Sequence, residues 1–276
     1  MRSEKLILQR TMELNCVITQ TVQVSPIMKI IKVKPDGWQF PKFEAGQFVG
    51  LGLRPEAPRC AEATIEHTPP KPDKLIKRAY SIASSSTDQA IEFYITLVHS
   101  GQLTPRLFEL KIGDRIWMGK KAVGMFTLEQ IDQESNVLMV ATGTGVAPYM
   151  SMLRTNALKR RGKILVIQGA SNSWDLGYSS ELKLLANMFE NFEYYPTITE
   201  PEKEPTGWDG DTRFVQDIWL SGLADRLWGF KPKPDNTHIF LCGNPRMVDG
   251  MKAILANDGF TEHSRRVFGQ IHAEEF

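Results

Sequence analysis

The stretch NVLMVATGTGVAP, residues 136–148, decides the fold of the second half of the chain. Its first part, up to residue 141, is a short apolar run, as expected for a parallel strand that is buried on both faces of a sheet. Glycines and a proline follow, and then a segment with a helical pattern at 149–159. Glycines let a backbone approach a pyrophosphate closely, and the positive end of the next helix would face it. The stretch therefore predicts a nucleotide-binding α/β unit.

The same succession of strand, loop and helix continues to the end of the chain. The expected pairs are 163–168 with 179–189, 193–198 with 214–228, and 238–242 with 247–257. This alternation predicts a doubly wound α/β domain with a parallel sheet. We expect this domain to cover residues 133–276.

The first half is patterned like an antiparallel β-barrel. Apolar and β-branched runs at 16–24, 28–33, 47–53, 79–83, 91–98 and 115–118 alternate with turn formers. One helix is expected at 104–110, with Pro105 in its first turn. Five prolines and little hydrophobic pattern at 54–77 predict a long surface loop, to which the sequence assigns no role. We expect this barrel domain to cover residues 11–132.

Composition and charge narrow the choice of partners. The chain has 33 basic and 32 acidic residues, a net charge of +1, whereas nucleic acid or an anionic membrane would select a basic excess. Three scattered cysteines and five histidines show no spacing typical of metal ligands, and a plant-type iron–sulfur centre needs four cysteines. With no membrane-spanning apolar run and no signal-peptide core at the start, we expect a cytoplasmic protein, and we expect a monomer.

The motif Arg78-Ala79-Tyr80-Ser81 follows the proline-rich loop. An arginine can donate two hydrogen bonds to a pyrophosphate, and a tyrosine two residues on lies on the same strand face and offers a flat surface to a ring system. The alternative is a surface charge beside an ordinary core tyrosine.

A second motif, Gly101-Gln102-Leu103-Thr104-Pro105-Arg106, lies between a strand and a helix. Backbone N–H groups at a helix start and a threonine hydroxyl can bind phosphate without a lysine. The alternative is an ordinary helix start with Thr104 as its N-cap.

The glycine turn of residues 142–145 and the motif Cys242-Gly243-Asn244-Pro245 each follow an expected strand. Ligands of such sheets bind at the carboxyl ends of the strands, so the two motifs should meet there. The glycine turn lacks the spacing of the common dinucleotide fingerprint, which suggests a different binding geometry. Cys242 is read either as part of this site or as a small buried residue.

These pieces, together with the aromatic end of the chain, resemble the ferredoxin–NADP⁺ reductase family, and more closely its bacterial flavodoxin/ferredoxin reductase branch. The motifs RAYS, GQLTPRL, ATGTGVAPY and CGNPRMV occur here in the family's order and spacing. The likeness extends from about Cys16 to Phe276. It implies an FAD-binding barrel, an NADP-binding α/β domain, and ferredoxin or flavodoxin as electron carrier.

The resemblance also implies roles for single residues. Arg78 and Tyr80 would hold the FAD pyrophosphate and stack on the isoalloxazine ring, with Ser81 hydrogen-bonded near flavin N5. Phe276 would stack on the other flavin face and move to admit nicotinamide, as opposed to a frayed chain end, and Glu274 is a candidate proton relay. We assign catalysis to Ser81, Glu274 and Phe276, and cofactor binding to Arg78, Ala79, Tyr80, Ser81, Gly101, Leu103, Thr104, Thr142, Gly143, Thr144, Gly145, Ser171, Arg213, Cys242, Gly243, Asn244, Met247 and Phe276.

The chain departs from the family where the nucleotide would be selected. NADPH-preferring relatives place arginines at positions that hold Ser171 and Glu200 here, and only Arg213 matches. The family implies NADP(H), whereas Ser171 and Glu200 make NAD(H) plausible, unless Glu200 points to solvent. The chain also ends at Phe276 without the tryptophan that often follows in close bacterial relatives.

Two other functions remain open from the sequence. One is an NADH-dependent reductase component of an oxygenase system, with the iron–sulfur domain on another chain. The other is a non-catalytic FAD electron-transfer subunit, although such subunits usually carry iron–sulfur cysteines that are absent here.

Overall fold

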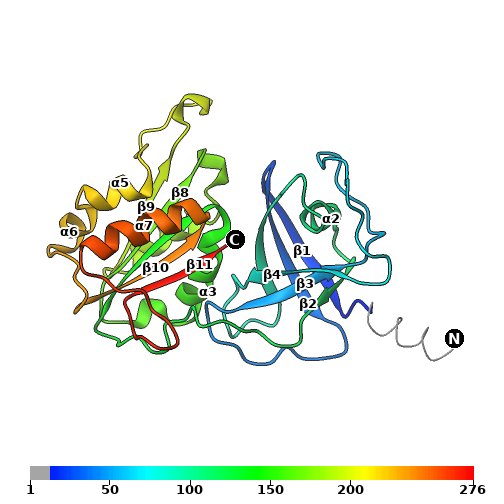
Figure 1. The fold of residues 1–276 in the computed structure, drawn as a ribbon, viewed down its shortest axis with the longest axis horizontal. Helices are drawn as coiled ribbons and strands as arrows, with labels where there is room; N and C mark the ends of the chain where they lie inside the picture. Colours follow the sequence, from blue (N-terminus) through cyan, green and yellow to red (C-terminus); the bar gives the residue numbers. More distant parts are fainter. Residues whose placement is uncertain (1–12) are drawn as a thin grey trace. The chain divides into compact units, whose positions relative to one another are not determined.

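A computed structural model describes residues 13–276. The chain divides into two compact units, the first ending at Met125 and the second spanning Phe126–Phe276 (Figure 1). This boundary lies before the expected one at 132/133. The reason is that Phe126 packs edge-on against Phe240 and stacks on Tyr149, which joins the connecting segment to the second unit.

The first unit is built on a six-stranded antiparallel sheet in the order β4-β3-β6-β1-β2-β5. One hydrophobic core, formed by residues such as Ile18, Leu51 and Phe93, packs between these strands and the helix α2. The elements are β1 (Cys16–Ser25), β2 (Met28–Pro35), β3 (Phe48–Leu53), β4 (Ile76–Ser81), β5 (Ile91–Thr96), α2 (Thr104–Glu109) and β6 (Arg115–Met118).

The strand after the long loop begins earlier than its pattern indicates. β4 starts at Ile76 rather than at Ala79, because Ile76 pairs with Leu53 and both side chains are buried. The loop therefore covers residues 54–75, which contain no helix or strand of their own.

The second unit is the expected doubly wound α/β domain. Its five parallel strands lie in the order β11-β10-β7-β8-β9, and α5, α6 and α7 pack together on one face of the sheet (Figure 1). The strands and helices are β7 (Asn136–Thr142), α3 (Ala147–Thr155), β8 (Ile164–Ala170), α4 (Ser179–Met188), β9 (Phe192–Ile198), α5 (Val215–Leu220), α6 (Leu223–Trp228), β10 (Thr237–Gly243), α7 (Pro245–Asn257) and β11 (Ile271–Glu275). Short 3₁₀ turns lie at η1 (Gly143–Val146), η2 (Ala157–Lys159), η3 (Ser173–Asp175) and η4 (Pro201–Lys203).

Two elements of this unit differ from their sequence patterns. The expected helix at 214–228 is two helices, because Gly222 has a φ of +69°, which an α-helix cannot contain. The chain end, for which the sequence predicts no strand, forms β11 against β10.

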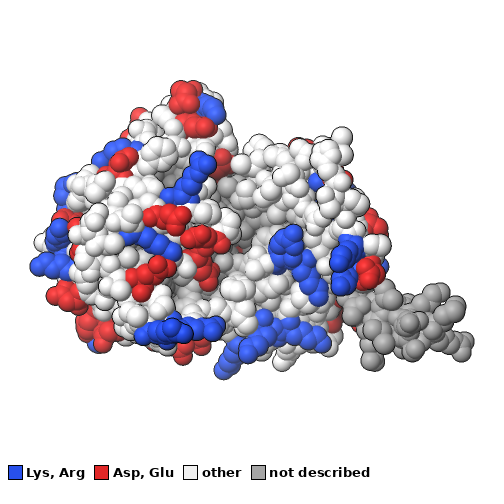
Figure 2. Space-filling model, in the orientation of Figure 1, with Lys and Arg blue, Asp and Glu red and all other residues white. Residues whose placement is uncertain are grey.

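Charges of both signs are scattered over the surface that Figure 2 shows, in keeping with the near-zero net charge. None of the helices among residues 13–276 is both long and apolar enough to cross a bilayer. Within the same residues, no group of three or more histidine, cysteine or acidic side chains could hold a metal ion.

Candidate functional site

The carboxyl ends of β7, β10 and β11 bring three of the sequence motifs together. These strands are parallel neighbours, and Cys242 lies in register with Ala141 on one side and with Glu274 on the other. The glycine turn, the Cys242–Pro245 motif and the chain end therefore lie side by side at one edge of the sheet (Figure 1). This is the edge at which ligands of such sheets bind.

The first two of these motifs interlock through their glycines. A Cβ atom on Gly145 would overlap the carbonyl group of Cys242, and one on Gly243, whose φ is +138°, would overlap Thr142. The Thr142 hydroxyl in turn accepts a hydrogen bond of 3.0 Å from Asn244 N. Contact between the two loops thus already requires these glycines, apart from any ligand.

Tyr149, to which the sequence assigns no role, connects α3 to the two strands that end at this edge. Its ring is fully buried, and its hydroxyl lies 2.9 Å from the Val140 carbonyl oxygen and 2.8 Å from that of Phe240. Burial raises the pKa of Tyr149 well above its ordinary value, so the hydroxyl stays protonated. α3 is thereby fixed to both β7 and β10 directly behind the glycine turn.

Several side chains assigned to cofactor binding are used for packing. Met247 lies 5% exposed in the core beneath α7, and Leu103 is 2% exposed in the core of the first unit. Cys242 is fully buried, and burial raises its pKa, so its thiol is uncharged. Asn244 caps α7, since its side-chain oxygen accepts a hydrogen bond from Arg246 N at 2.9 Å. In the second unit, the Cys242, Asn244 and Met247 side chains thus support the sheet edge through burial and capping, and Leu103 does the same for the core of the first unit.

The chain end pairs with β10 as far as Glu275. Glu274 is half-buried, and burial raises its pKa to about 7. Phe276 N donates a hydrogen bond of 3.4 Å to the Gly243 carbonyl, while the Phe276 ring is 60% exposed. A titratable carboxyl group and an accessible aromatic ring therefore stand at the same edge as the two interlocked loops.

In the first unit, the Arg78–Ser81 motif occupies the end of β4. Arg78 is exposed and donates a 2.7 Å hydrogen bond to the Lys77 carbonyl, and Ala79 pairs with Gly50 of β3. Tyr80 packs against the core, and burial raises its pKa. Among the described residues, the Tyr80 and Ser81 hydroxyls have no hydrogen-bond partner. The strand end thus presents a guanidinium group and two hydroxyls that are open to a ligand.

The Gly101–Thr104 loop is closed on itself. The Thr104 hydroxyl bridges the backbone of Val98, accepting from its N–H at 3.0 Å and donating to its carbonyl at 3.2 Å. A Cβ atom on Gly101 would lie 3.0 Å from this hydroxyl. Leu103, not Thr104, is the N-cap residue of α2. The threonine therefore shapes the loop and is neither a helix cap nor a free phosphate ligand.

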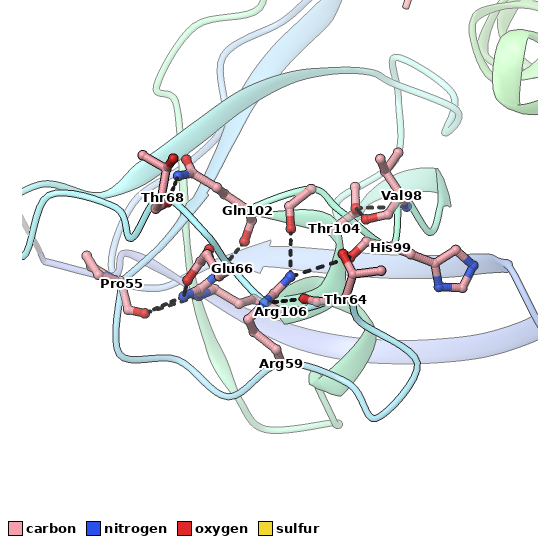
Figure 3. A network of polar contacts seen from close by, with 11 residues as sticks. Pro55, Arg59, Thr64, Glu66, Thr68, Val98, His99, Gln102, Thr104 and Arg106 are labelled. Atoms are coloured by element: carbon pink, nitrogen blue, oxygen red, sulfur yellow. Dashed lines mark hydrogen bonds and ion pairs between the residues drawn. The ribbon is translucent and has the colours of Figure 1, made fainter.

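Arg106 ties this loop to the long loop of residues 54–75 (Figure 3). The Arg106 side chain is 4% exposed and forms a two-pronged pair with Glu66, with both N···O distances at 3.0 Å. It also donates to the carbonyls of Pro55 and Gln102, at 2.7 and 2.6 Å. This guanidinium group keeps the pKa of Glu66 below its ordinary value.

Two weaker ties join the same loops. Arg59 donates to the Gly101 carbonyl at 3.3 Å, and Gln102 donates to the Thr68 carbonyl at 3.0 Å. The long loop is therefore a fixed part of the first unit that supports the Gly101–Thr104 loop from outside.

The ends of β8 and β9 bring the expected nucleotide-selecting residues together. Glu200 N donates to the Ser171 carbonyl at 2.9 Å, so these two residues are neighbours. The Glu200 carboxylate is paired with Lys203 at 2.6 Å, and Arg213 is paired with Asp211. Asp211 belongs to none of the sequence motifs, although its position two residues before Arg213 is a usable signal.

Comparison with known proteins gives concordant results. A family model described as the oxidoreductase NAD-binding domain matches residues 139–253. The flavodoxin/ferredoxin–NADP reductase of Buchnera aphidicola subsp. Baizongia pistaciae is 34% identical over 236 residues, covering 85% of this chain and 88% of the relative. The protein of the same name from Escherichia coli is 30% identical over 207 residues, covering 75% of this chain and 76% of the relative.

Among solved structures, a ferredoxin NADP⁺ reductase from Neisseria gonorrhoeae, crystallised with bound FAD and NADP, has the same fold. It aligns with a TM-score of 0.79 and 23% identity, covering 95% of this chain and 97% of the other.

Proposed function

This chain belongs to the flavodoxin/ferredoxin–NADP reductase family and is an oxidoreductase, and from that premise we propose that it uses non-covalently bound FAD to exchange electrons between a nicotinamide dinucleotide and ferredoxin or flavodoxin. The carriers named in its relatives take electrons singly, whereas nicotinamide transfers a hydride. When bound, FAD supplies the conversion between these two kinds of transfer.

The observation that carries this proposal is the set of groups at the end of β4. An exposed guanidinium, a half-buried phenol ring and an adjacent hydroxyl without a partner suit a pyrophosphate and a polar ring system. In the proposal, Arg78 would bind the FAD pyrophosphate and Tyr80 would stack on the isoalloxazine ring. The Ser81 hydroxyl would donate a hydrogen bond near flavin N5. The Gly101–Thr104 loop, held by Arg106, contributes its shape and its backbone.

The sheet edge of the second unit serves the nicotinamide nucleotide in this proposal. In the proposal the dinucleotide binds against the interlocked Thr142–Gly145 and Cys242–Asn244 loops, because ligands of such sheets bind at the carboxyl ends of the strands. Glu274 holds a proton near neutral pH, as a relay requires. The exposed Phe276 ring at the same edge has the properties of a movable cover, and that role stays a prediction.

Replacement of Arg78 tests the flavin half of the proposal. Arg78→Ala removes the charged donor, which should weaken FAD binding by about 1.5–3 kcal/mol, roughly a ten- to hundred-fold rise in the dissociation constant. The measurement is the flavin-to-protein ratio after dialysis, followed by titration of the apoprotein with FAD. Lys74→Ala removes a nearby exposed charge and should leave FAD binding unchanged. An Arg78→Ala protein that keeps FAD as tightly as the parent contradicts this placement of the pyrophosphate.

The carrier is identified by a partner-dependent turnover assay. We expect reduced nucleotide to be oxidised much faster when ferredoxin or flavodoxin is added. If turnover instead requires an iron–sulfur oxygenase component and ignores both small carriers, the chain is the reductase of an oxygenase system.

A further inference from the structure

The carboxyl ends of β8 and β9 hold several charged side chains, and the most strongly fixed pair is Asp211 with Arg213. Arg213 Nε lies 3.0 and 3.1 Å from the two Asp211 carboxylate oxygens, and Arg213 Nη2 also donates to Asp211. Such two-pronged, charge-assisted pairs are among the stronger side-chain hydrogen bonds. The one arginine that matches a 2′-phosphate position of NADPH-preferring relatives is therefore already paired with a carboxylate.

Asp211 is itself held in place from several sides. The Tyr195 hydroxyl donates to its carboxylate at 2.9 Å, and Arg213 N donates to the same group at 2.9 Å. The Asp211 backbone forms a β-bridge with Thr197, at the end of β9. Its side chain is 7% exposed, whereas that of Arg213 is 42% exposed. The carboxylate is thus the fixed member of the pair, and it determines where the guanidinium points.

A second carboxylate lies beside the end of β8. Glu204 accepts hydrogen bonds from Ser173 N at 2.7 Å and from the Ser173 hydroxyl at 2.6 Å. Glu200, next to Ser171, is paired with Lys203 at 2.6 Å. The Ser173 donors after β8 are therefore already bonded to a carboxylate, and Lys203 is paired with another.

The charge balance of this cluster disfavours a further phosphate. Near these strand ends, Lys203 is paired with Glu200 and Arg213 with Asp211, and Glu204 adds a further carboxylate that is bonded to Ser173. A 2′-phosphate on the adenosine ribose carries up to about two negative charges and needs arginines that are free to face it. A ribose 2′-hydroxyl instead needs an acceptor, which an acidic side chain near these strand ends supplies in NAD sites.

We propose that this cluster selects a dinucleotide with a free adenosine 2′-hydroxyl, NADH, and that Asp211 is the specificity-determining residue because it holds Arg213. This inference rests on the proposed nucleotide-binding function of the second unit. It makes the carboxylate at 211, rather than the arginine at 213, the group that decides which nucleotide is used.

Calorimetric titration of the holoenzyme with two probes tests the inference without turnover. The probes are AMP and adenosine 2′,5′-bisphosphate, which differ only in the 2′-phosphate. We expect the parent protein to bind AMP at least as tightly as the bisphosphate. Asp211→Asn keeps the shape of the side chain but releases the guanidinium, and it should shift the ratio of the two affinities toward the bisphosphate by about ten-fold or more.

Two further variants make the result specific. Asp209→Asn causes the same change in net charge at an exposed position two residues away, and it should leave the ratio within about two-fold of the parent's. Arg213→Ala, combined with Asp211→Asn, should abolish the gain that Asp211→Asn produces alone.

The possible outcomes distinguish failure of this inference from failure of the proposed nucleotide binding. A parent protein that prefers the bisphosphate by more than about ten-fold, or an Asp211→Asn ratio equal to the parent's, overturns the inference alone. Failure of both probes to bind the parent protein overturns the nucleotide-binding function on which the inference rests.

Discussion

At the scale of single residues, the raised pKa of the Glu274 carboxyl group makes the stability of the folded protein depend on pH. This carboxyl group shares the sheet edge with the buried Cys242 thiol, and burial raises its pKa from the ordinary value of 4.5 to about 7. The folded protein therefore binds a proton at Glu274 over a pH range in which the unfolded chain has released it. In that range, from about pH 4.5 to about pH 7, this residue makes the folded state less stable as the pH rises.

Glu274→Gln removes this titration. We expect the variant to gain melting temperature relative to the parent at about pH 8 and to gain less at about pH 5, where the parent carboxyl is protonated. Melting curves of both proteins across this range measure the difference. His272, whose pKa burial lowers to about 3, loses stability in the opposite direction, as the pH falls, but it is present in both proteins and cancels. A gain that is the same at every pH contradicts the assignment.

At the scale of single residues, the sequence indicates which residue types occur near the candidate site better than it indicates which groups they contact. The Arg78 motif lies at a strand end and keeps its polar groups open, as its pattern suggests. Thr104 and Met247 match the family's motifs, yet their side chains close a loop and fill a core. The difference is not visible in a motif, because it depends on the rotamer and on neighbours that are distant in sequence.

At the scale of elements, the composition of the loop at residues 54–75 predicts its lack of secondary structure but not its contacts. Prolines and a weak hydrophobic pattern correctly indicate a segment without helix or strand. They do not indicate that Glu66 reaches Arg106, which lies 40 positions later in the chain. The pair joins the loop to α2 through a guanidinium group that is almost completely buried.

Glu66→Gln tests this tie. The substitution keeps the shape of the side chain but leaves a buried arginine without its counter-charge, although the Pro55 and Gln102 carbonyls still accept its hydrogen bonds. We expect the free energy of unfolding of the first unit to fall by about 1–3 kcal/mol.

Urea titration followed by circular dichroism measures this loss. Glu56→Gln makes the same change in charge at an exposed position of the same loop, and it should shift stability by less than about 0.5 kcal/mol. Equal effects of the two substitutions would mean that the loop is not held by this pair.

The chain end is an element that pattern analysis missed. β11 is only five residues long and mostly polar, IHAEE, so it lacks the continuous apolar run expected of a buried parallel strand. Ile271 and, in part, Ala273 pack into the hydrophobic core, while His272 between them is buried and stacks on Phe240. The alternation of apolar Ile271 and Ala273, two residues apart, is the sequence signal that predicts this strand.

For the whole molecule, both halves of the predicted architecture are confirmed: an antiparallel β unit is followed by a doubly wound parallel sheet. These were predictable because hydrophobic period and glycine placement are local properties of the chain. The charge pairing at the ends of β8 and β9 was not, because Glu204 and Asp211 enter the cluster from loops whose paths no periodicity describes. Glu200, the acid singled out by the sequence, is paired with Lys203, so its charge is largely offset.

The most direct test of the central claim is anaerobic mixing of the purified flavoprotein with reduced nicotinamide nucleotide in a stopped-flow spectrometer. We predict that the visible flavin absorption is lost rapidly, with NADH at least as effective as NADPH, and that it returns when oxidised ferredoxin or flavodoxin is added. A protein that contains FAD but keeps its flavin absorption with both nucleotides would contradict the account.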